Sequence, residues 1–253
     1  MQTVLVTGAS AGIGRATALR LAGHGFGVVL TYRNRAGDAE NTVAQIRAAD
    51  GTAAALPLDV SDISSFPGFV DQLSATLHDV WQADRLDALV NNAGIGGGTP
   101  FEEVSEELFD QMHLTLLKGP YFLTQQLLPL LPDGAAIVNI GSTSALPTGT
   151  ESGYSSYAAQ KGAMHTLTRC WAKELAPRRI RVNAVAPGST RTRIAGDAFA
   201  DLPQHTLNQL AATVALGRVG EPDDIAAAIE FLIGPDNSWV TGQVLECSGG
   251  QRL

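Results

Sequence analysis

The chain has 253 residues, of which 45% are hydrophobic and 17% are charged, and its formal net charge is −8. This balance is typical of a folded globular protein, because disordered chains are poorer in apolar residues and richer in charge. The negative charge disfavours binding to the phosphates of a nucleic acid. No apolar run reaches the roughly 18 to 20 residues that span a bilayer, so we expect neither a nucleic acid nor a membrane as partner.

The start of the chain and its cysteines bear on the compartment. A strand-like segment begins at Thr3, almost at Met1, which leaves no room for a signal peptide, so we expect a cytoplasmic protein. Cys170 and Cys247 lie far apart, and neither belongs to a CxxC or Cys/His pattern. We therefore expect two reduced and mostly buried thiols, with no disulfide and no bound metal.

Short runs rich in Val, Ile and Leu alternate with helical patterns along the whole chain. The predicted strands cover residues 4–6, 27–31, 53–58, 86–90, 135–140, 180–185 and 244–246, and the predicted helices cover 12–23, 39–49, 66–81, 105–131, 154–176 and 222–232. Strands separated by helix-length segments indicate βαβ units. We expect an α/β fold with one doubly wound sheet of about seven parallel strands, helices on both faces, in a single domain spanning residues 1–253.

One stretch breaks this rhythm. Residues 188–216 have a mixed composition and no clear hydrophobic period. A long irregular segment in a compact domain usually has a function, often as a lid over a site. We therefore expect a flexible substrate lid at about residues 189–216.

The first predicted strand runs directly into a glycine-rich turn, TGASAGIG at residues 7–14, and then into a helix. Gly8, Gly12 and Gly14 would let the backbone approach a pyrophosphate, whose charge the N–H groups at the helix start would meet. The spacing is GxxxGxG and not GxGxxG, and a purely structural strand-to-helix turn is the alternative. In its βαβ context the pattern predicts a Rossmann-type dinucleotide site.

The end of the second predicted strand bears on which dinucleotide is bound. An acid there would bind the ribose 2′-hydroxyl of NAD(H), whereas an arginine would accommodate the 2′-phosphate of NADP(H). The sequence reads LTYRNR at residues 30–35, and no acid follows before Asp38. Because a guanidinium pairs strongly with a phosphate, Arg33 and Arg35 favour NADP(H) over NAD(H). Solvated loop charges are the alternative reading of both arginines.

Further short motifs follow in order along the chain. They are Asp59-Val60, Asn91-Asn92-Ala93-Gly94, Asn139-Ile140-Gly141-Ser142, Tyr157-Ala158-Ala159-Gln160-Lys161, Asn183-Ala184-Val185-Ala186-Pro187-Gly188 with Thr192, Arg218-Val219-Gly220-Glu221-Pro222 and Ser248-Gly249-Gly250. Their order and spacing resemble the short-chain dehydrogenase/reductase family in its single-domain form, over essentially the whole chain. Within that family the chain is similar to 3-oxoacyl-carrier-protein reductases and related carbonyl reductases.

The resemblance assigns roles to several of these residues. It implies that Asp59 and Val60 hold the adenine and that Thr192 meets the carboxamide of the nicotinamide. A structural strand cap is the alternative reading of the Asn-Asn-Ala-Gly turn, and is compatible with a cofactor role. The complete expected set of cofactor-binding residues is Gly8, Ser10, Gly12, Ile13, Gly14, Arg33, Asp59, Val60, Asn91, Ala93, Gly94, Tyr157, Lys161, Pro187, Gly188 and Thr192.

Tyr157 is the candidate general acid, because the oxygen of a carbonyl must be protonated or stabilised as a hydride reaches its carbon. Lowering the pKa of a phenol from about 10 to near 7 requires roughly 4 kcal/mol, which one ammonium about 4 Å away supplies at an effective dielectric near 20. Lys161 lies four residues on, on the same helix face. Tyr154 is the rival acid, but alanine stands four residues after it, so we interpret Tyr154 as part of the pocket wall.

Two positions depart from the family pattern. Ser142 is the expected hydroxyl for the substrate oxygen, but the family usually places this serine slightly closer to the tyrosine, which leaves Ser144 as the alternative. Leu116 stands where the family commonly has an asparagine whose backbone carbonyl helps to place a water that connects the lysine to solvent. Leucine keeps the carbonyl but lacks the amide that would steady a local distortion. We hypothesise that proton resupply is impaired or rerouted.

Together these features imply an NADP(H)-dependent oxidoreductase that transfers a hydride between nicotinamide and a small carbonyl or alcohol substrate, with Ser142, Tyr157 and Lys161 as catalytic residues. A cofactor-binding regulatory protein with weak or no catalysis is the alternative, which Leu116 favours. Eight of the 17 basic residues fall within 161–193, where they form either a basic face for an anionic substrate or carrier protein, or a solvated helix surface. The resemblance also implies a homotetramer, with a dimer as the alternative, packed through the apolar helices 105–131 and 154–176.

Overall fold

Seven short apolar segments form one parallel sheet with the strand order β3-β2-β1-β4-β5-β6-β7. The computed structural model describes residues 1–192 and 202–253. The elements are β1 (Thr3–Val6), α1 (Gly12–Gly23), β2 (Gly27–Tyr32), α2 (Ala36–Ala48), β3 (Ala53–Pro57), α3 (Phe66–Trp81), β4 (Ala88–Asn91), α4 (Glu106–His113), α5 (Gly119–Leu127), β5 (Ala136–Ile140), α6 (Ser155–Glu174), β6 (Arg181–Pro187), α7 (Gln204–Ala211), α8 (Pro222–Ile233) and β7 (Val244–Cys247). The predicted doubly wound, Rossmann-type α/β fold is confirmed.

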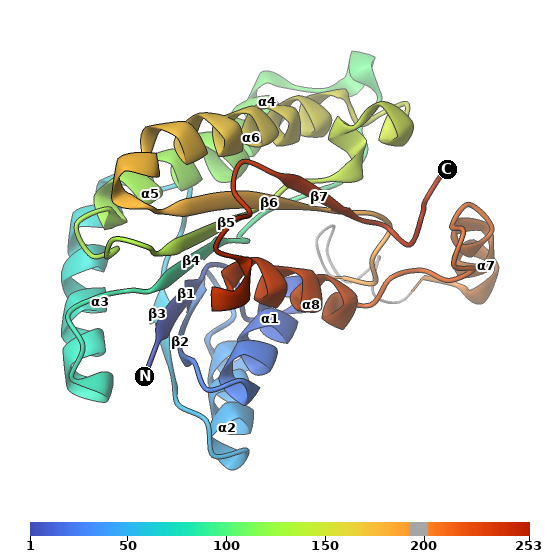
Figure 1. Cartoon of the computed structure of the whole chain (residues 1–253). Coiled ribbons are helices and arrows are strands. Elements are labelled where there is room, and N and C mark those ends of the chain that lie inside the picture. Colours follow the sequence, from blue (N-terminus) through green and yellow to red (C-terminus); the bar gives the residue numbers. More distant parts are fainter. Residues whose placement is uncertain (193–201) are drawn as a thin grey trace.

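Both faces of the sheet are covered, so β1, β4 and β5 are buried at every position and are mostly apolar. Val4 and Val6 of β1 point into a core shared with α1, α2 and α8, whereas Leu5 points into the core on the opposite face, shared with α3, α5 and α6. Figure 1 shows α1 and α8 on one side of the sheet and α5 and α6 on the other. A strand buried on both faces has no polar alternation, which is why continuous Val, Ile and Leu runs predict it well.

The helix predicted over residues 105–131 is interrupted. A π-helical turn at Leu114–Lys118 separates α4 from α5, and the Gly119 amide donates to the carbonyl of Leu114. Pro120 has no amide hydrogen with which to complete the ordinary helical bond to the carbonyl of Leu116. The prediction of one continuous helix is therefore wrong, and Pro120 was the signal against it. The distortion forms here without the asparagine amide that the family commonly supplies.

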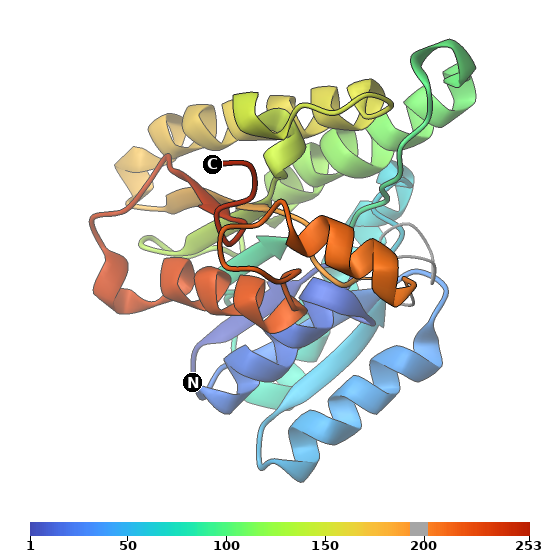
Figure 2. The same cartoon turned by 90° about the vertical axis from the view of Figure 1, so that its right-hand side faces the viewer.

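The predicted irregular stretch at residues 188–216 contains a helix that the sequence analysis missed. Helix α7 covers Gln204–Ala211, and isolated bridges join Thr190 to Gly220 and Val214 to Gln251. Figure 2 shows α7 in front of the edge of the sheet that is turned toward the viewer. Residues 193–201, the middle of the proposed lid, lie outside the described part of the chain.

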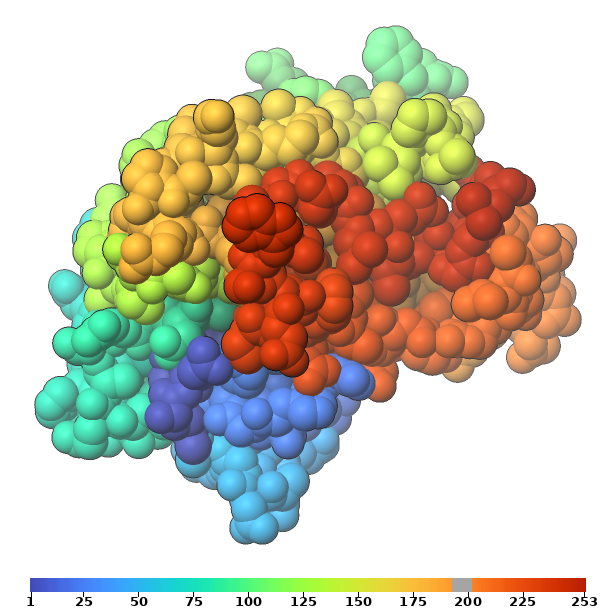
Figure 3. Space-filling model, viewed as in Figure 1, coloured from blue at the N-terminus to red at the C-terminus, as the bar shows by residue number. Residues whose placement is uncertain are grey.

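The last quarter of the chain lies between segments from the start and the middle. Figure 3 shows its red and orange residues between the blue residues of α1 and the yellow residues of α6. Helix α8 packs on α1 and contributes to the core beneath β5 and β6. Among the described residues, no helix combines the length and the apolar character needed to cross a membrane, and no three His, Cys, Asp or Glu side chains are grouped as metal ligands. The expected burial of the thiols is wrong for Cys170, which is exposed, while Cys247 is half-buried.

Candidate active site

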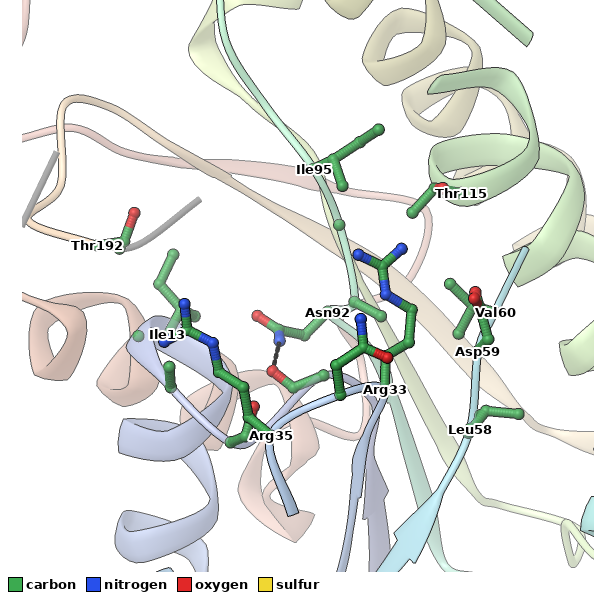
Figure 4. Close-up of a pocket in the computed structure, with 17 residues that line it drawn as sticks. Ile13, Arg33, Arg35, Leu58, Asp59, Val60, Asn92, Ile95, Thr115 and Thr192 are labelled. Carbon is green, nitrogen blue, oxygen red and sulfur yellow. Dashed lines mark hydrogen bonds between the residues drawn. The ribbon is translucent and has the colours of Figure 1, made fainter. Parts of the chain in front are cut away.

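A cavity of about 490 Å³ opens at the carboxyl ends of the first four strands of the chain. Figure 4 shows its lining side chains, which come from the turns after β1, β2, β3 and β4, from the π-helical turn and, with Thr192, from the segment after β6. The lining residues are Gly8, Ser10, Ala11, Gly12, Ile13, Arg33, Asn34, Arg35, Leu58, Asp59, Val60, Asn92, Ala93, Gly94, Ile95, Thr115 and Thr192. The structure thus brings together most of the predicted cofactor-binding residues.

The glycine-rich turn leaves no room for a side chain at Gly8 or Gly14. Gly8 has a φ of +64°, and a Cβ on it would lie 2.7 Å from the Cα of Ala93. Gly14 is not in the wall of the cavity, and a Cβ on it would lie 2.4 Å from Nδ2 of Asn92. Asn92 donates to the carbonyls of Thr7 and Gly8 at 2.8 and 3.1 Å (the bond to Gly8 is dashed in Figure 4). These contacts hold the turn against the end of β4.

The two arginines after β2 differ in their partners. Figure 4 shows the side chains of both reaching from the end of β2 into the cavity. Nη1 of Arg35 lies 3.7 Å from a carboxylate oxygen of Asp38, so its charge is partly matched. Within the described residues Arg33 forms no ion pair. Arg33 therefore presents the unmatched positive charge at this end of the cavity.

The part of the cavity wall formed by the turn after β3 and by the π-helical turn contains two expected cofactor-binding residues and one residue that the sequence analysis missed. Asp59 and Val60 line the cavity, and Oδ1 of Asp59 accepts hydrogen bonds from the amide and hydroxyl of Ser61 at 2.9 and 2.6 Å. Thr115, in the π-helical turn, also lines it, and its buried hydroxyl has no hydrogen-bond partner among the described residues. A buried polar atom without a partner requires an explanation, and a bound group is one.

Asn91 is not in the wall of this cavity, contrary to expectation. Its side chain is buried beneath β4, where Nδ2 donates to Oγ1 of Thr124 at 3.0 Å and to Oδ1 of Asn139 at 2.9 Å. Asn91 is the last residue of β4, and its neighbour Asn92 faces the cavity instead. The reason is the alternation of side chains along a strand, which sends consecutive residues to opposite sides.

A second cavity, of about 160 Å³, adjoins the first and shares Ile13, Asn92 and Thr192 with it. Its wall comes from the ends of β5 and β6, the loop before α6, the first turns of α6 and the end of the chain. It contains Ser142, Tyr157, Lys161, Pro187 and Gly188. All three predicted catalytic residues therefore lie at one cavity. This cavity is continuous with the first, which is called the glycine-rich cavity from here on.

Tyr157 is buried among apolar side chains, with Met112 and Leu116 in the same cluster. Burial raises the pKa of Tyr157 to about 12, a hydrogen bond with Ser142 opposes the rise, and Tyr154 adds to it. The expected pKa near 7 is thus not found in this structure. The ammonium of Lys161 lies 5.7 Å from the centroid of the tyrosine ring and donates to the carbonyl of Ile140 at 2.7 Å.

Lys161 is itself buried, and burial lowers the pKa of its ammonium to about 8. One helical turn further on, His165 is also buried, and burial together with the charges of Lys161 and Arg169 lowers its pKa to about 4. Its Nε2 accepts the amide N–H of Ser142 at 3.4 Å. A Cβ on Gly141 would lie 2.1 Å from this ring nitrogen. The sequence analysis missed His165, although its spacing of four from Lys161 was a signal.

Ser142 and Ser144 both line the second cavity, with their hydroxyl oxygens 3.1 Å apart. Ser142 is the more buried of the two, and of this pair it is Ser142 whose hydroxyl lies close enough to the phenol to lower the pKa of Tyr157. Its hydroxyl also accepts the amide N–H of Ser144 at 3.1 Å. This geometry favours Ser142 over Ser144 as the hydroxyl beside the tyrosine.

The basic residues of segment 161–193 do not form one surface among the described residues. Lys161 is buried in the second cavity, and the guanidinium of Arg181 donates to carbonyls of residues 232–234 at the end of α8. Three more are ion-paired with carboxylates: Arg178 and Arg179 with Asp133, and Arg191 with Glu221. The predicted basic face is therefore dispersed over several separate contacts.

Comparisons with known proteins agree with this geometry. A model of the family described as enoyl-(acyl carrier protein) reductase matches residues 8–252. The 3-oxoacyl-[acyl-carrier-protein] reductase FabG of Thermotoga maritima is 36% identical over 251 residues, covering 97% of this chain and 96% of that protein. The promiscuous reductase LugOII, which catalyses keto-reduction at C1 in lugdunomycin biosynthesis, is 35% identical with a TM-score of 0.94, over 100% of this chain and 98% of the other.

A second solved structure bears on the cofactor. The angucycline C-6 ketoreductase LanV, solved with bound NADP, is 34% identical with a TM-score of 0.92, and the match covers 98% of this chain and 95% of that one. The family model, the relatives and the sheet topology agree over nearly the whole length. The chain belongs to the short-chain dehydrogenase/reductase family of oxidoreductases.

Proposed function

We propose that the protein is an NADP(H)-dependent carbonyl reductase, which transfers a hydride between nicotinamide and a C=O or CH–OH carbon of a small molecule. The observation that carries this proposal is the continuity of the two cavities. Ser142, Tyr157 and Lys161 meet in a cavity that adjoins the glycine-rich cavity. A hydride donor bound in the larger cavity would thus have its reactive end beside these three side chains.

The residues of the larger cavity fit NADP(H) in three ways. The crowded glycines leave backbone N–H groups at the start of α1 free to meet a pyrophosphate. Arg33 would pair with the 2′-phosphate, since its guanidinium has no carboxylate partner among the described residues. The NADP bound to the related ketoreductase LanV gives further support. Asp59 and Val60 would hold the adenine, and Thr192 would meet the carboxamide.

The proposed proton transfer uses the buried phenol of Tyr157. The cofactor would supply a hydride to the carbonyl carbon. Ser142 would hold the substrate oxygen through its hydroxyl, beside Tyr157. Because burial raises the pKa of Tyr157 to about 12, the phenol is protonated at neutral pH and can donate its proton to the developing alkoxide. Lys161, whose pKa of about 8 keeps most of it charged at pH 7, would stabilise the phenolate that remains.

Further proposals concern the assembly and the organisation of the chain. We infer a homotetramer, with a dimer as the alternative. Phe109 on α4 and Tyr121 on α5 are each more than a third exposed, and such aromatic side chains support burial against another subunit. We also infer that residues 1–253 act as one cytoplasmic domain with a substrate lid around residues 189–216.

The proposal is tested by calorimetric titration with NADPH and NADH, followed by NADPH oxidation against a panel of diketones, keto esters and aldehydes. Tyr157→Phe should reduce kcat by about 10² to 10⁴, because the proton donor is lost while the ring remains. Tyr154→Phe, which removes the hydroxyl of the neighbouring tyrosine in the same cavity, is the matched control and should retain most of the activity. Binding of NADPH without turnover of any panel member would favour the regulatory alternative.

A further inference from the structure

The second cavity, which contains Ser142, Tyr157 and Lys161 and is called the substrate cavity from here on, has few charged groups. Among the described residues, its charged lining side chains are Lys161, Glu151 and Arg252. Lys161 lies at the bottom, where its ammonium is held by the carbonyl of Ile140. The other two form an ion pair between Nη2 of Arg252 and Oε1 of Glu151, although they are 101 positions apart in the sequence. No role for this pair follows from the family motifs.

Backbone hydrogen bonds hold the end of the chain, residues 249–252, beside the substrate cavity. Gly249 and Gly250 turn it with φ values of +64° and +76°, and their carbonyls accept the amides of Leu216 and Ala215 at 3.0 and 3.2 Å. The amide of Arg252 then donates to the carbonyl of Thr213 at 2.8 Å. The Ser248-Gly249-Gly250 motif thus directs the final residues along the segment that follows α7, and Figure 2 shows this part of the chain beside α7.

Gln251 provides a second attachment, on the other flank of the cavity. It is buried, its Oε1 accepts the amide of Ser189 at 2.7 Å, and its Nε2 donates to the hydroxyl of the same serine at 2.9 Å. A Cβ on Gly188 would lie 2.6 Å from Oε1 of Gln251. Because Gln251 is fixed, the next residue, Arg252, has a defined direction toward the loop that carries Glu151.

The charge of Glu151 acts inside the cavity. The pKa of Tyr154 is raised, first by burial and then by the negative charge of Glu151. The ring of Tyr154 lies edge-on to that of Tyr157, with 6.3 Å between the centroids. The side chains of Glu151 and Arg252 are 38% and 35% exposed, so a bound substrate can still approach them.

We propose that the Glu151–Arg252 ion pair sets the charge preference of the substrate cavity, so that the natural substrate is an uncharged carbonyl compound; this inference rests on the proposed reductase function. A carboxylate in the cavity would compete with Glu151 for Arg252 and leave a repelling charge beside it. An ammonium group would compete with Arg252 for Glu151 and would leave the positive charge of Arg252 beside it. An uncharged ketone or aldehyde leaves the pair intact, which is why the pair selects it.

The test compares a 4-oxo acid with its methyl ester, which differ in charge but share the reacting carbonyl. In the wild-type protein kcat/KM should be higher for the ester. Glu151→Gln should shift the acid-to-ester ratio toward the acid by about fivefold, and Arg252→Gln should shift it away by a similar factor, as expected for a partly exposed pair. The double variant should return near the wild-type ratio.

Two controls separate the pair from a general loss of charge. Arg252→Lys keeps the positive charge and should preserve the wild-type ratio. Glu174→Gln removes an exposed carboxylate on α6 outside the cavity and should also leave the ratio unchanged. A shift of less than twofold in both single variants at the pair, or an equal shift in Glu174→Gln, overturns the inference.

Calorimetric binding of the acid and the ester to each NADP⁺-saturated variant gives the same ratio without turnover. If the wild-type protein oxidises NADPH with neither compound, the panel of carbonyl compounds decides the reductase function, while the binding ratios decide the charge preference separately. If neither compound binds any variant and neither is reduced, the inference is overturned.

Discussion

The two cavities of this protein are built in different ways. The glycine-rich cavity is lined mainly by Gly8 and residues 10–13, 33–35, 58–60 and 92–95, which lie in short turns after strands or at the start of α1. Most of the wall of the substrate cavity comes from residues 140–161, in the connection after β5 and the first turns of α6, from residues 187–192 at and after the end of β6, and from residues 251–252 at the end of the chain. A site made by turns at strand ends has local sequence signals, such as glycine where the backbone is crowded. A site made by side chains from distant segments does not.

The largest effect in the glycine-rich cavity should come from Arg33→Ala. Removal of the guanidinium should weaken NADPH binding by about 10- to 100-fold, because a hydrogen bond to a charged group contributes about 1.5–3 kcal/mol, and should leave NADH binding nearly unchanged. Calorimetric titration measures both. Arg35→Ala is the matched control, with a smaller effect expected because Arg35 pairs with Asp38. Equal losses for the two cofactors would contradict the assignment of Arg33 to the 2′-phosphate.

Gly119→Ala tests the packing between Val60, in the wall of the glycine-rich cavity, and the interrupted helix. A Cβ on Gly119 would lie 1.8 Å from the carbonyl oxygen of Val60, so the substitution should lower the free energy of unfolding by about 1–3 kcal/mol or more. Gly68, in α3, has nothing within 4 Å of its Cβ position, and Gly68→Ala should instead stabilise by about 0.5–1 kcal/mol. Urea unfolding measures the free energy of unfolding of both variants. Equal values would show that Gly119 does not lie against the carbonyl of Val60.

His165 provides a pH test on the substrate side. Burial and the charges of Lys161 and Arg169 lower the pKa of His165 in the folded chain to about 4, from about 6.5 in the unfolded chain, so between these pH values the unfolded chain binds a proton that the folded chain does not. Stability is therefore complete above pH 6.5 and falls as the pH is lowered toward 4. His165→Gln, which keeps an acceptor for the amide of Ser142, should flatten this slope by up to about 1.4 kcal/mol per pH unit.

Urea unfolding at several pH values measures that slope. His205→Gln changes an exposed histidine on α7 and is the control, with no comparable flattening expected. An unchanged slope in His165→Gln would mean that His165 is not held in its neutral form behind Ser142.

Leu116→Asn should have the smallest effect on the measured properties. Leu116 contacts both regions, because it lies near Tyr157 of the substrate cavity and near Gly94 of the glycine-rich cavity. Leu116 packs in the apolar cluster of Tyr157, and its Cδ2 lies 3.3 Å from the Cβ position of Gly94. An amide there should raise turnover severalfold if proton resupply limits it, and should lower the pKa of Tyr157 because the surroundings become more polar. The pH profile of kcat measures both. A folded variant with unchanged turnover and profile would count against a role for this position in proton supply.

Particular residues account for what sequence reasoning missed. Helix α7 went unrecognised because its segment has a mixed composition and its eight residues include no buried one, so no apolar stripe marked it. The break between α4 and α5 had a local cause in Pro120, which the long apolar pattern of residues 105–131 outweighed. Asn91 was assigned to the cofactor site in place of Asn92, because the family motif contains both and only the direction of each side chain at the end of β4 separates them.

The sequence by itself determined the seven strands, most of the helices, the glycine-rich turn and the Tyr157 and Lys161 pair, because each depends on a local pattern: apolar runs in strands buried on both faces, glycine where backbone atoms crowd, and a spacing of four on a helix. Only the tertiary structure decided the raised pKa of Tyr157, the burial of His165 behind Ser142 and the contact of Glu151 with Arg252. These depend on desolvation and on contacts between distant segments, which exist only once the sheet and its loops have come together.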